Sequence, residues 1–413
     1  MENNMLHLTP PHREVPGCYA FPAEKIQLGT SAAAVSLPVV DISRSRDEVC
    51  RAILDAGKEM GFFQVVNHGV PDQVMRDMES VCVEFFRLPA EDKAALYSED
   101  PRKTNRLFCG ALYGNSGEKY WRDCLRLACT FPVVKSTEDW PGNPQRFRFW
   151  FRDYGYREVA EKFTVLTRGL GMELLRLLCQ SLELRHDYFE GDLSGSDVIL
   201  HVNHYPPCPD PSVTLGLPPH CDRGLITLLH PGTVPGLEIA YKGNWIKVAP
   251  LPNAFIVNFG LQLEVVTNGL LKSIEHRAMT NVARARTSVA TFIMPTQACL
   301  VGPAGEFLSE DNPPRYRTMT YGEFSRGYAA VNMGSSPLHI NTDLKNIQEM
   351  RHSHKSFKPA AQWDIILTSS VGCIHEDINK KCSINNGMKE ICLFVAFFSA
   401  RSNEEMLPLR ISN

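Results

Sequence analysis

The sequence lacks several features that would assign it to a familiar class of protein. Its 13 cysteines are scattered over 413 residues and include no C-x-x-C pair. This argues against a disulfide framework and favours free thiols in a reducing compartment, so we expect a cytoplasmic protein. The amino-terminal residues have no basic stretch followed by an apolar run, and no secretory signal is therefore expected.

Excess charge of either sign and long apolar runs are also missing. With 43 Lys and Arg against 46 Asp and Glu, the formal net charge is -3, which provides no basic surface for nucleic acid. The most apolar run, residues 391–400, is too short to span a bilayer. We therefore expect no nucleic-acid partner and no membrane partner. A monomer with a small-molecule substrate is a separate expectation.

The composition, 44% hydrophobic and 22% charged, is that of an ordinary globular protein. Residues 1–34 show no sustained periodicity and are interpreted as an amino-terminal arm. Residues 35–190 form a region of helices and strands, and residues 195–345 form a second domain that ends in a returning helix at 316–328. Residues 351–413 are basic and polar at first and are interpreted as a carboxy-terminal extension of uncertain structure.

Helical periodicity dominates the first half of the chain and a period of two dominates the second. Apolar residues recur at helical spacing in 46–60, 71–86 and 159–182. Alternating segments separated by Pro, Gly and Asn then follow, at 198–205, 225–229, 237–241, 245–248, 254–258, 276–280 and 287–293. Many short strands at this spacing predict a β-sandwich or a jelly roll. The expected fold is mainly β, with a helical region before the strands.

A histidine and an aspartate two residues apart, with a second histidine far along the chain, are candidate metal ligands. These are His220, Asp222 and His276. Residues i and i+2 of an extended chain point to the same side, so His220 and Asp222 can face one ion. An H-x-D pair alone is weak evidence in a chain with 13 histidines. The adjacent Pro218 and Pro219 strengthen it, because their fixed φ angles position His220 rigidly.

A candidate anion site follows ten residues after His276. Arg286 and Ser288 have the same spacing as the first pair, and Tyr205 stands at a predicted strand end where its hydroxyl can donate. We expect a turn near Ala283 to make the strands of His276 and Arg286 antiparallel neighbours, which would bring the two residues together. The sequence thus predicts that one anion lies beside the metal.

The residue types indicate one chemistry. Two imidazoles and a carboxylate are the ligands of non-haem Fe(II), and they leave three coordination positions free, enough for a 2-oxo acid and dioxygen. The far carboxylate of such an acid requires a planar, permanently charged group, which is Arg rather than Lys. We therefore predict Fe(II) as cofactor and 2-oxoglutarate and O2 as co-substrates.

Five stretches resemble the plant 2-oxoglutarate/Fe(II)-dependent dioxygenases: GFFQVVNHG at 61–69, NHYPPCP at 203–209, LPPHCD at 217–222, NGLLKSIEH at 268–276 and RTS at 286–288. The resemblance covers residues 35–345. It implies a double-stranded β-helix, also called a jelly-roll or cupin-like core, with ascorbate as a supporting reductant. It also implies iron ligands at His220, Asp222 and His276, and 2-oxoglutarate contacts at Arg286, Ser288, Tyr205 and Asn203.

Within that family the sequence is similar to those of the mugineic-acid dioxygenases of grasses, as in GEKYW at 117–121, GLEIAYKG at 236–243 and QLEVVTNG at 262–269. These enzymes hydroxylate a phytosiderophore at its 2′ or 3 carbon. A substrate of this kind requires cationic and polar groups at the pocket, for which the candidates are Arg106, Lys119, Trp121, Arg122, Arg223 and Phe292. An alkaloid, hormone or flavonoid substrate remains an alternative, as does a non-catalytic cupin-like metal-binding protein.

The chain departs from the family pattern in four places. Cys221 replaces the usual Thr or Ser, and Leu261 replaces the usual Asp. Neither position is a predicted ligand, and strand alternation predicts that Cys221 points away from the metal. Residues 141–156 are rich in arginine and aromatic residues and remain unplaced, and their part near 146–156 is longer than the usual connection of the family. Residues 351–413 have no family counterpart, and we expect them to pack poorly.

Overall fold

The computed structural model describes residues 12–26, 36–109, 119–131, 140–144 and 159–331. By its contacts the chain divides into one unit at residues 1–350 and another at 351–413. All described residues belong to the first unit. The predicted carboxy-terminal extension lies outside the described residues, as does most of the unplaced stretch at 141–156.

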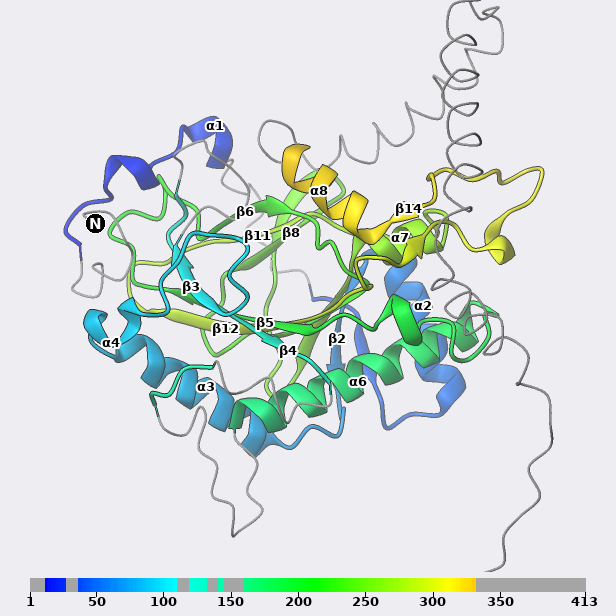
Figure 1. Cartoon of the computed structure of the whole chain (residues 1–413), viewed down its shortest axis with the longest axis horizontal. Helices are drawn as coiled ribbons and strands as arrows, with labels where there is room; N and C mark the ends of the chain where they lie inside the picture. Colours follow the sequence, from blue (N-terminus) through cyan, green and yellow to red (C-terminus); the bar gives the residue numbers. More distant parts are fainter. Residues whose placement is uncertain (1–11, 27–35, 110–118, 132–139, 145–158, 332–413) are drawn as a thin grey trace, which may run out of the picture. The chain divides into compact units, whose positions relative to one another are not determined.

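Two β-sheets form the framework of the described unit (Figure 1). The larger sheet has eight strands in the order β1 (Val39–Asp41), β2 (Phe62–Val66), β10 (Phe255–Phe259), β7 (Ile226–His230), β12 (Arg286–Ile293), β5 (Val198–Tyr205), β4 (Asp123–Cys129) and β3 (Arg106–Cys109). The smaller sheet has four, in the order β6 (Leu217–His220), β11 (His276–Ala278), β8 (Leu237–Tyr241) and β9 (Asn244–Lys247). A two-stranded ladder joins β13 (Leu300–Val301) to β14 (Met319–Thr320).

Three long helices pack against the larger sheet (Figure 1). They are α2 (Arg46–Glu59), α3 (Asp72–Arg87) and α6 (Val159–Ser181), close to the predicted helices. The shorter helices are α1 (Ala23–Ile26), α4 (Ala90–Ala94), α7 (Leu261–Val266) and α8 (Tyr321–Val331), with 3-10 turns at Gly17–Tyr19, Gly191–Leu193 and Gly305–Phe307. The predicted mainly β class, with helices in the amino-terminal region, is confirmed.

Side-chain alternation along β12 separates the hydrophobic core from a cavity. Val289 and Ile293 pack in the main apolar core, and Thr291 faces Thr167 of α6. The intervening residues point to the opposite face and line a cavity between the sheets, where Arg286 and Ser288 lie. A strand that is apolar toward the helices and polar toward the cavity is stabilised by the burial of one face only. The other face remains available for chemistry.

The prediction that the strands of His276 and Arg286 are antiparallel neighbours is wrong. β11 pairs with β6 and β8 in the smaller sheet, whereas β12 pairs with β5 and β7 in the larger one. A turn does form near Ala283, where the side-chain oxygen of Asn281 accepts hydrogen bonds from the backbone amides of Ala283 and Arg284. Instead of closing a hairpin, this turn takes the chain from the smaller sheet to the larger one. His276 and Arg286 therefore lie on opposite sides of the cavity.

Two other boundaries differ from the sequence-based prediction. The strands predicted at 237–241 and 245–248 pair as a hairpin, β8 and β9, but β9 begins one residue earlier. Tyr241 pairs with Asn244, so the central residues of the turn are Lys242 and Gly243, both at positive φ. This is the backbone geometry that a tight two-residue hairpin turn requires. The returning helix begins at Tyr321, because the preceding residues are paired in β14.

Candidate metal centre and adjoining cavity

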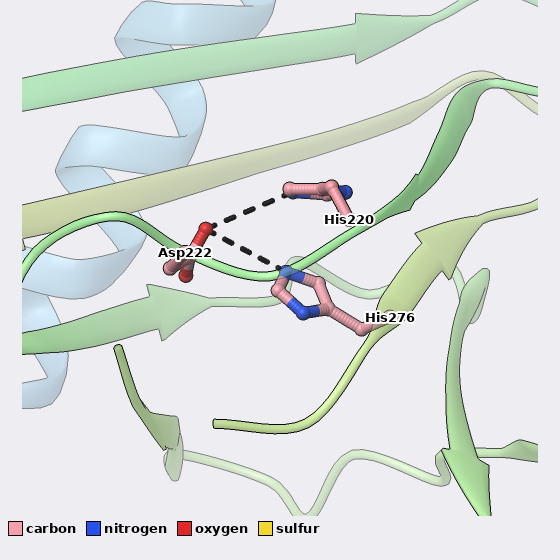
Figure 2. A group of neighbouring side chains, drawn as sticks. All are labelled: His220, Asp222 and His276. Carbon is pink, nitrogen blue, oxygen red and sulfur yellow. Dashed lines mark ion pairs between the residues drawn. The ribbon is translucent and has the colours of Figure 1, made fainter. Parts of the chain in front are cut away.

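The three predicted metal ligands converge at one end of the cavity (Figure 2). His220 ends β6 and His276 begins β11, and the two are direct partners in the antiparallel ladder. Asp222 follows β6, and its Oδ1 lies 3.7 Å from Nε2 of His220 and 3.8 Å from Nε2 of His276. All three side chains are buried. The strand pairing thus brings together two histidines that are 56 positions apart in the sequence, as one shared metal site requires.

Backbone carbonyls fix the orientation of both imidazole rings. Nδ1 of His220 lies 2.8 Å from the carbonyl of Pro218, and Nδ1 of His276 lies 3.2 Å from that of Ile274. Because a carbonyl oxygen can only accept, each Nδ1 carries the proton and donates. Each Nε2 therefore presents a lone pair toward Asp222, which is the tautomer that binds a metal.

Two polar side chains of the larger sheet hold Asp222. Thr227 of β7 donates to its Oδ2 at 2.6 Å, and the amide of Asn258 of β10 donates to the same oxygen at 2.8 Å. The second carboxylate oxygen, Oδ1, is left facing the histidines. The carboxylate is therefore oriented by bonds that do not compete with a metal ion.

The protonation states match metal binding. Burial, followed by the proximity of His276, lowers the pKa of His220. Burial alone would raise the pKa of Asp222, but the two histidines and the bonds from Asn258 and Thr227 lower it overall. Neutral imidazole and ionised carboxylate are the forms that coordinate a metal. Two nitrogens and one oxygen converging on one point fit non-haem Fe(II).

Arg286 lies on the opposite sheet and is almost completely buried, with 3% of its surface exposed. Its Nε donates to the carbonyl of Val234 at 3.1 Å, and its guanidinium carbon is 5.2 Å from the centre of the Tyr205 ring. Burial lowers the pKa of Arg286, but a guanidinium remains charged in proteins. Ser288 and Asn203 are ladder partners one step further along the same strands. All four predicted anion-site residues line the cavity.

The six predicted substrate residues fall into two groups. Arg122, Arg223 and Phe292 line the cavity. The other three do not: the guanidinium of Arg106 lies over the Phe108 ring, Trp121 donates to the carbonyl of Pro206, and the backbone of Lys119 donates to Cys18. In this part of the chain β3 is the edge strand of the larger sheet, and its neighbour β4 contributes Arg126 to the cavity.

Several cavity residues were missed in the sequence. Arg126 of β4 and His201 of β5 line the cavity, as does Arg277, whose charge is paired with Glu238 at 2.7 Å. Thr227 and Asn258, which orient Asp222, were also missed. Alternation within β4 and β5 could have identified Arg126 and His201, because they share a face with predicted site residues. No local signal distinguishes Thr227 or Asn258 from ordinary polar residues of a strand.

Comparison with known proteins assigns the family. Residues 196–295 match the 2OG-Fe(II) oxygenase superfamily, and residues 37–150 match the amino-terminal domain described as "non-haem dioxygenase in morphine synthesis". The fold and the site thus define a non-haem iron oxygenase, and the chain belongs to the 2OG-Fe(II) oxygenase superfamily. The predicted cofactor Fe(II) and the co-substrate 2-oxoglutarate are confirmed at the level of the family.

Relatives with assigned names are similar over most of the chain. The 2′-deoxymugineic-acid 2′-dioxygenase of Hordeum vulgare is 63% identical over 84% of this chain and 99% of its own length. The mugineic-acid 3-dioxygenase of the same plant is 55% identical over 83% and 99%. The crystal structure of JOX2 in complex with 2OG, Fe and JA matches with a TM-score of 0.73 and 31% identity, over 83% of this chain and 98% of that one. The predicted jelly-roll fold is thereby confirmed.

Proposed function

We propose that this protein hydroxylates a mugineic-acid-type phytosiderophore, with 2′-deoxymugineic acid, attacked at the 2′ carbon, as the first candidate. The single observation that carries this proposal is the 63% identity to the barley 2′-dioxygenase over nearly the full length of that enzyme. Hydroxylation of mugineic acid at the 3 carbon is the second candidate, supported by 55% identity to the barley 3-dioxygenase.

The proposal gives His220, Asp222 and His276 the role of holding Fe(II). Their buried donor atoms, the fixed tautomers and the oriented carboxylate support it. Iron and 2-oxoglutarate together supply the oxidation, in which O2 is consumed, 2-oxoglutarate becomes succinate and CO2, and one oxygen atom becomes the hydroxyl of the product. The surrounding protein orients the reactants and excludes water.

Arg286 and Ser288 are proposed to bind the distal carboxylate of 2-oxoglutarate, with help from Tyr205 and Asn203. Arg286 extends from the sheet opposite His276, so a dicarboxylate can reach from the iron site to the guanidinium across the cavity. A charged and buried hydrogen-bond donor of this kind is costly to bury without an anion. This cost supports assigning an anionic ligand to that end of the cavity.

The charge of the cavity supports a polycarboxylate substrate over a neutral one. Five arginines line it, whereas Asp222 is the only acid among the described lining residues. Relatives named flavanone 3-dioxygenase 2 and hyoscyamine 6-dioxygenase are 37% and 38% identical to this chain. An excess of guanidinium groups favours a phytosiderophore with several carboxylates over the flavonoid and alkaloid alternatives.

The test is a competition assay with purified protein, Fe(II), 2-oxoglutarate and ascorbate. Deoxymugineic acid and mugineic acid are supplied together, and the products are analysed by mass spectrometry alongside succinate release. We expect an added oxygen on deoxymugineic acid and one succinate per product. Succinate without any hydroxylated phytosiderophore would contradict the proposal, and a product from mugineic acid alone would favour the second candidate.

Two finer proposals concern location and assembly. We propose a cytoplasmic protein, because the 13 cysteines are scattered along the chain without a C-x-x-C pair, which suits a reducing compartment. Among the described helices none has the length and apolarity needed to cross a bilayer. We also propose a monomer, which sedimentation of the purified protein can test directly.

A further inference from the structure

Arg122 is a buried cation whose hydrogen-bonding capacity is mostly unused. It is 1% exposed, and its Nη1 donates to Oδ1 of Asn203 at 3.0 Å. Its Nε and Nη2 have no hydrogen-bond partner in the described structure. The guanidinium carbon lies 5.6 Å from the centre of the Phe108 ring, a contact that leaves these donors unpaired. Leaving buried charged donors unpaired is energetically costly, so a ligand is the natural partner.

Arg126 brings a second guanidinium to the same wall. It lies on β4 directly opposite His201 of β5, and its Nη1 donates to the carbonyl of Thr104. Burial, followed by the repulsion of Arg106, lowers the pKa of Arg126 to about 10. The guanidinium is therefore still charged near neutral pH. No described acid forms an ion pair with Arg122 or Arg126.

The described residues do not neutralise the charge of this wall. Arg277 has Glu238 as a partner within hydrogen-bonding distance, but Arg122 and Arg126 have no such partner among the described residues. Burial, followed by repulsion from Arg126 and Arg122, lowers the pKa of His201 well below its usual value. His201 is therefore a neutral group between cations. A ligand that compensates the wall must contribute negative charge.

The Arg126 part of this wall is separate from the end of the cavity that contains Arg286, which Arg122 adjoins through its bond to Asn203. Arg286 pairs with Tyr205, whereas Arg126 lies opposite His201, four residues further along β5. Four residues of a strand correspond to roughly 13 Å. One 2-oxoglutarate anchored at Arg286 therefore leaves the Arg126 end available for a different anion.

We propose that Arg126, together with Arg122, forms the receptor for carboxylates of the substrate and thereby determines specificity for a polycarboxylate. The inference rests on the proposed function and identifies the residues that select its substrate. Arg122 has a second role, because its bond to Asn203 fixes an amide beside Ser288 at the co-substrate site. Arg126 makes no contact of that kind and is the residue that tests the inference.

The test compares steady-state kinetics of the wild type with Arg126→Gln, using deoxymugineic acid. We expect KM for the substrate to rise about 10- to 100-fold, as for the loss of one hydrogen-bonded charge pair, with KM for 2-oxoglutarate within about threefold of wild type. Arg185→Gln, at an exposed arginine, is the matched control and should change neither constant. An unchanged substrate KM in Arg126→Gln would overturn the inference.

A second variant and a modified substrate complete the design. Arg126→Lys keeps the positive charge but loses the planar fork. It should raise the substrate KM several-fold, and it decides the question if the glutamine variant misfolds. Converting the substrate carboxylates to amides should weaken turnover by the wild type strongly. Turnover by Arg126→Gln should fall much less, because this variant already lacks the contact between guanidinium and carboxylate. Equal losses in the two proteins would contradict the pairing of Arg126 with a substrate carboxylate.

The outcomes separate the two proposals. A wild type that turns over neither phytosiderophore contradicts the proposed function, and this inference falls with it. A wild type that is active while both Arg126 variants retain its substrate KM contradicts only the assignment of Arg126.

Discussion

Oγ1 of Thr227 lies 2.6 Å from Oδ2 of Asp222 and donates a hydrogen bond to it from the neighbouring sheet. This bond and the one from Asn258 occupy the oxygen that faces away from the histidines. The carboxylate cannot rotate without breaking both. The larger sheet thereby orients a candidate ligand that the smaller sheet supplies.

Thr227→Val should weaken iron binding while preserving the shape of the side chain. The hydrogen bond to a charged carboxylate is worth about 1.5–3 kcal/mol, and loss of such a supporting bond typically lowers metal affinity about 10- to 100-fold. Titration of Fe(II) under anaerobic conditions against a competing chelator measures the change. Thr227→Ser keeps the hydroxyl and should retain most of the affinity; an equal loss in both variants would refute this role.

Arg286→Lys should weaken 2-oxoglutarate binding much more than iron binding. A lysine cannot reproduce the planar bidentate contact, and we expect KM for 2-oxoglutarate to rise at least about tenfold. Arg284→Lys, at an exposed arginine on the same segment, is the matched control. Equal losses of iron and 2-oxoglutarate affinity would be inconsistent with an anion-binding role.

Gly236→Ala should disturb Arg286 without touching the metal centre. A methyl group at Gly236 would lie 2.9 Å from Cδ of Arg286 and 3.0 Å from the carbonyl of Met279, so the buried arginine must move. We expect a several-fold rise in KM for 2-oxoglutarate and unchanged Fe(II) affinity. Gly305→Ala, where the added methyl meets no atom within 4 Å, should leave both constants at their wild-type values.

Protonation of His204 should contribute to acid destabilisation. Burial, followed by the nearby Lys93 and Arg87, lowers its pKa to about 4, against 6.5 in an unfolded chain. Between these values the unfolded state binds more protons, so stability is retained above 6.5 and falls as the pH decreases through the window, by up to about 1.4 kcal/mol per pH unit. Urea unfolding at several pH values measures the slope.

His204→Gln should flatten that pH dependence while offering Thr287 a hydrogen-bonding group in place of the ring nitrogen that lies 2.9 Å from it. His186→Gln, at an exposed histidine, provides the comparison and should leave the slope as it is. If the slope of His204→Gln equals that of the wild type, His204 does not titrate in the way described.

The candidate metal triad could be predicted from the sequence because the evidence for it is local. His220 and Asp222 have a spacing that forces them onto one side of an extended chain, and His276 was recognised through the motif around it. The same reasoning grouped Arg286 with Ser288. Period-two alternation also located most strands of the two sheets, since each has one apolar face to bury.

The pairing of strands could not be predicted in the same way. The turn after His276 looks like a hairpin turn, but β11 pairs with β6 and β8 and thereby joins the smaller sheet. The same limitation explains why three of the six substrate candidates do not line the cavity. Arg106 and Arg126 are both arginines in a basic and aromatic stretch, but they lie opposite each other on β3 and β4. Which of them reaches the cavity depends on the register of β4 with β5.

The cavity is bounded by ligands on one sheet and Arg286 on the other, and this has a mechanical consequence. A small dicarboxylate held at both ends would act as a brace between the two layers. Loading the protein with metal and co-substrate should therefore raise its melting temperature more than the metal alone, by the free energy that tight binding contributes to the native state.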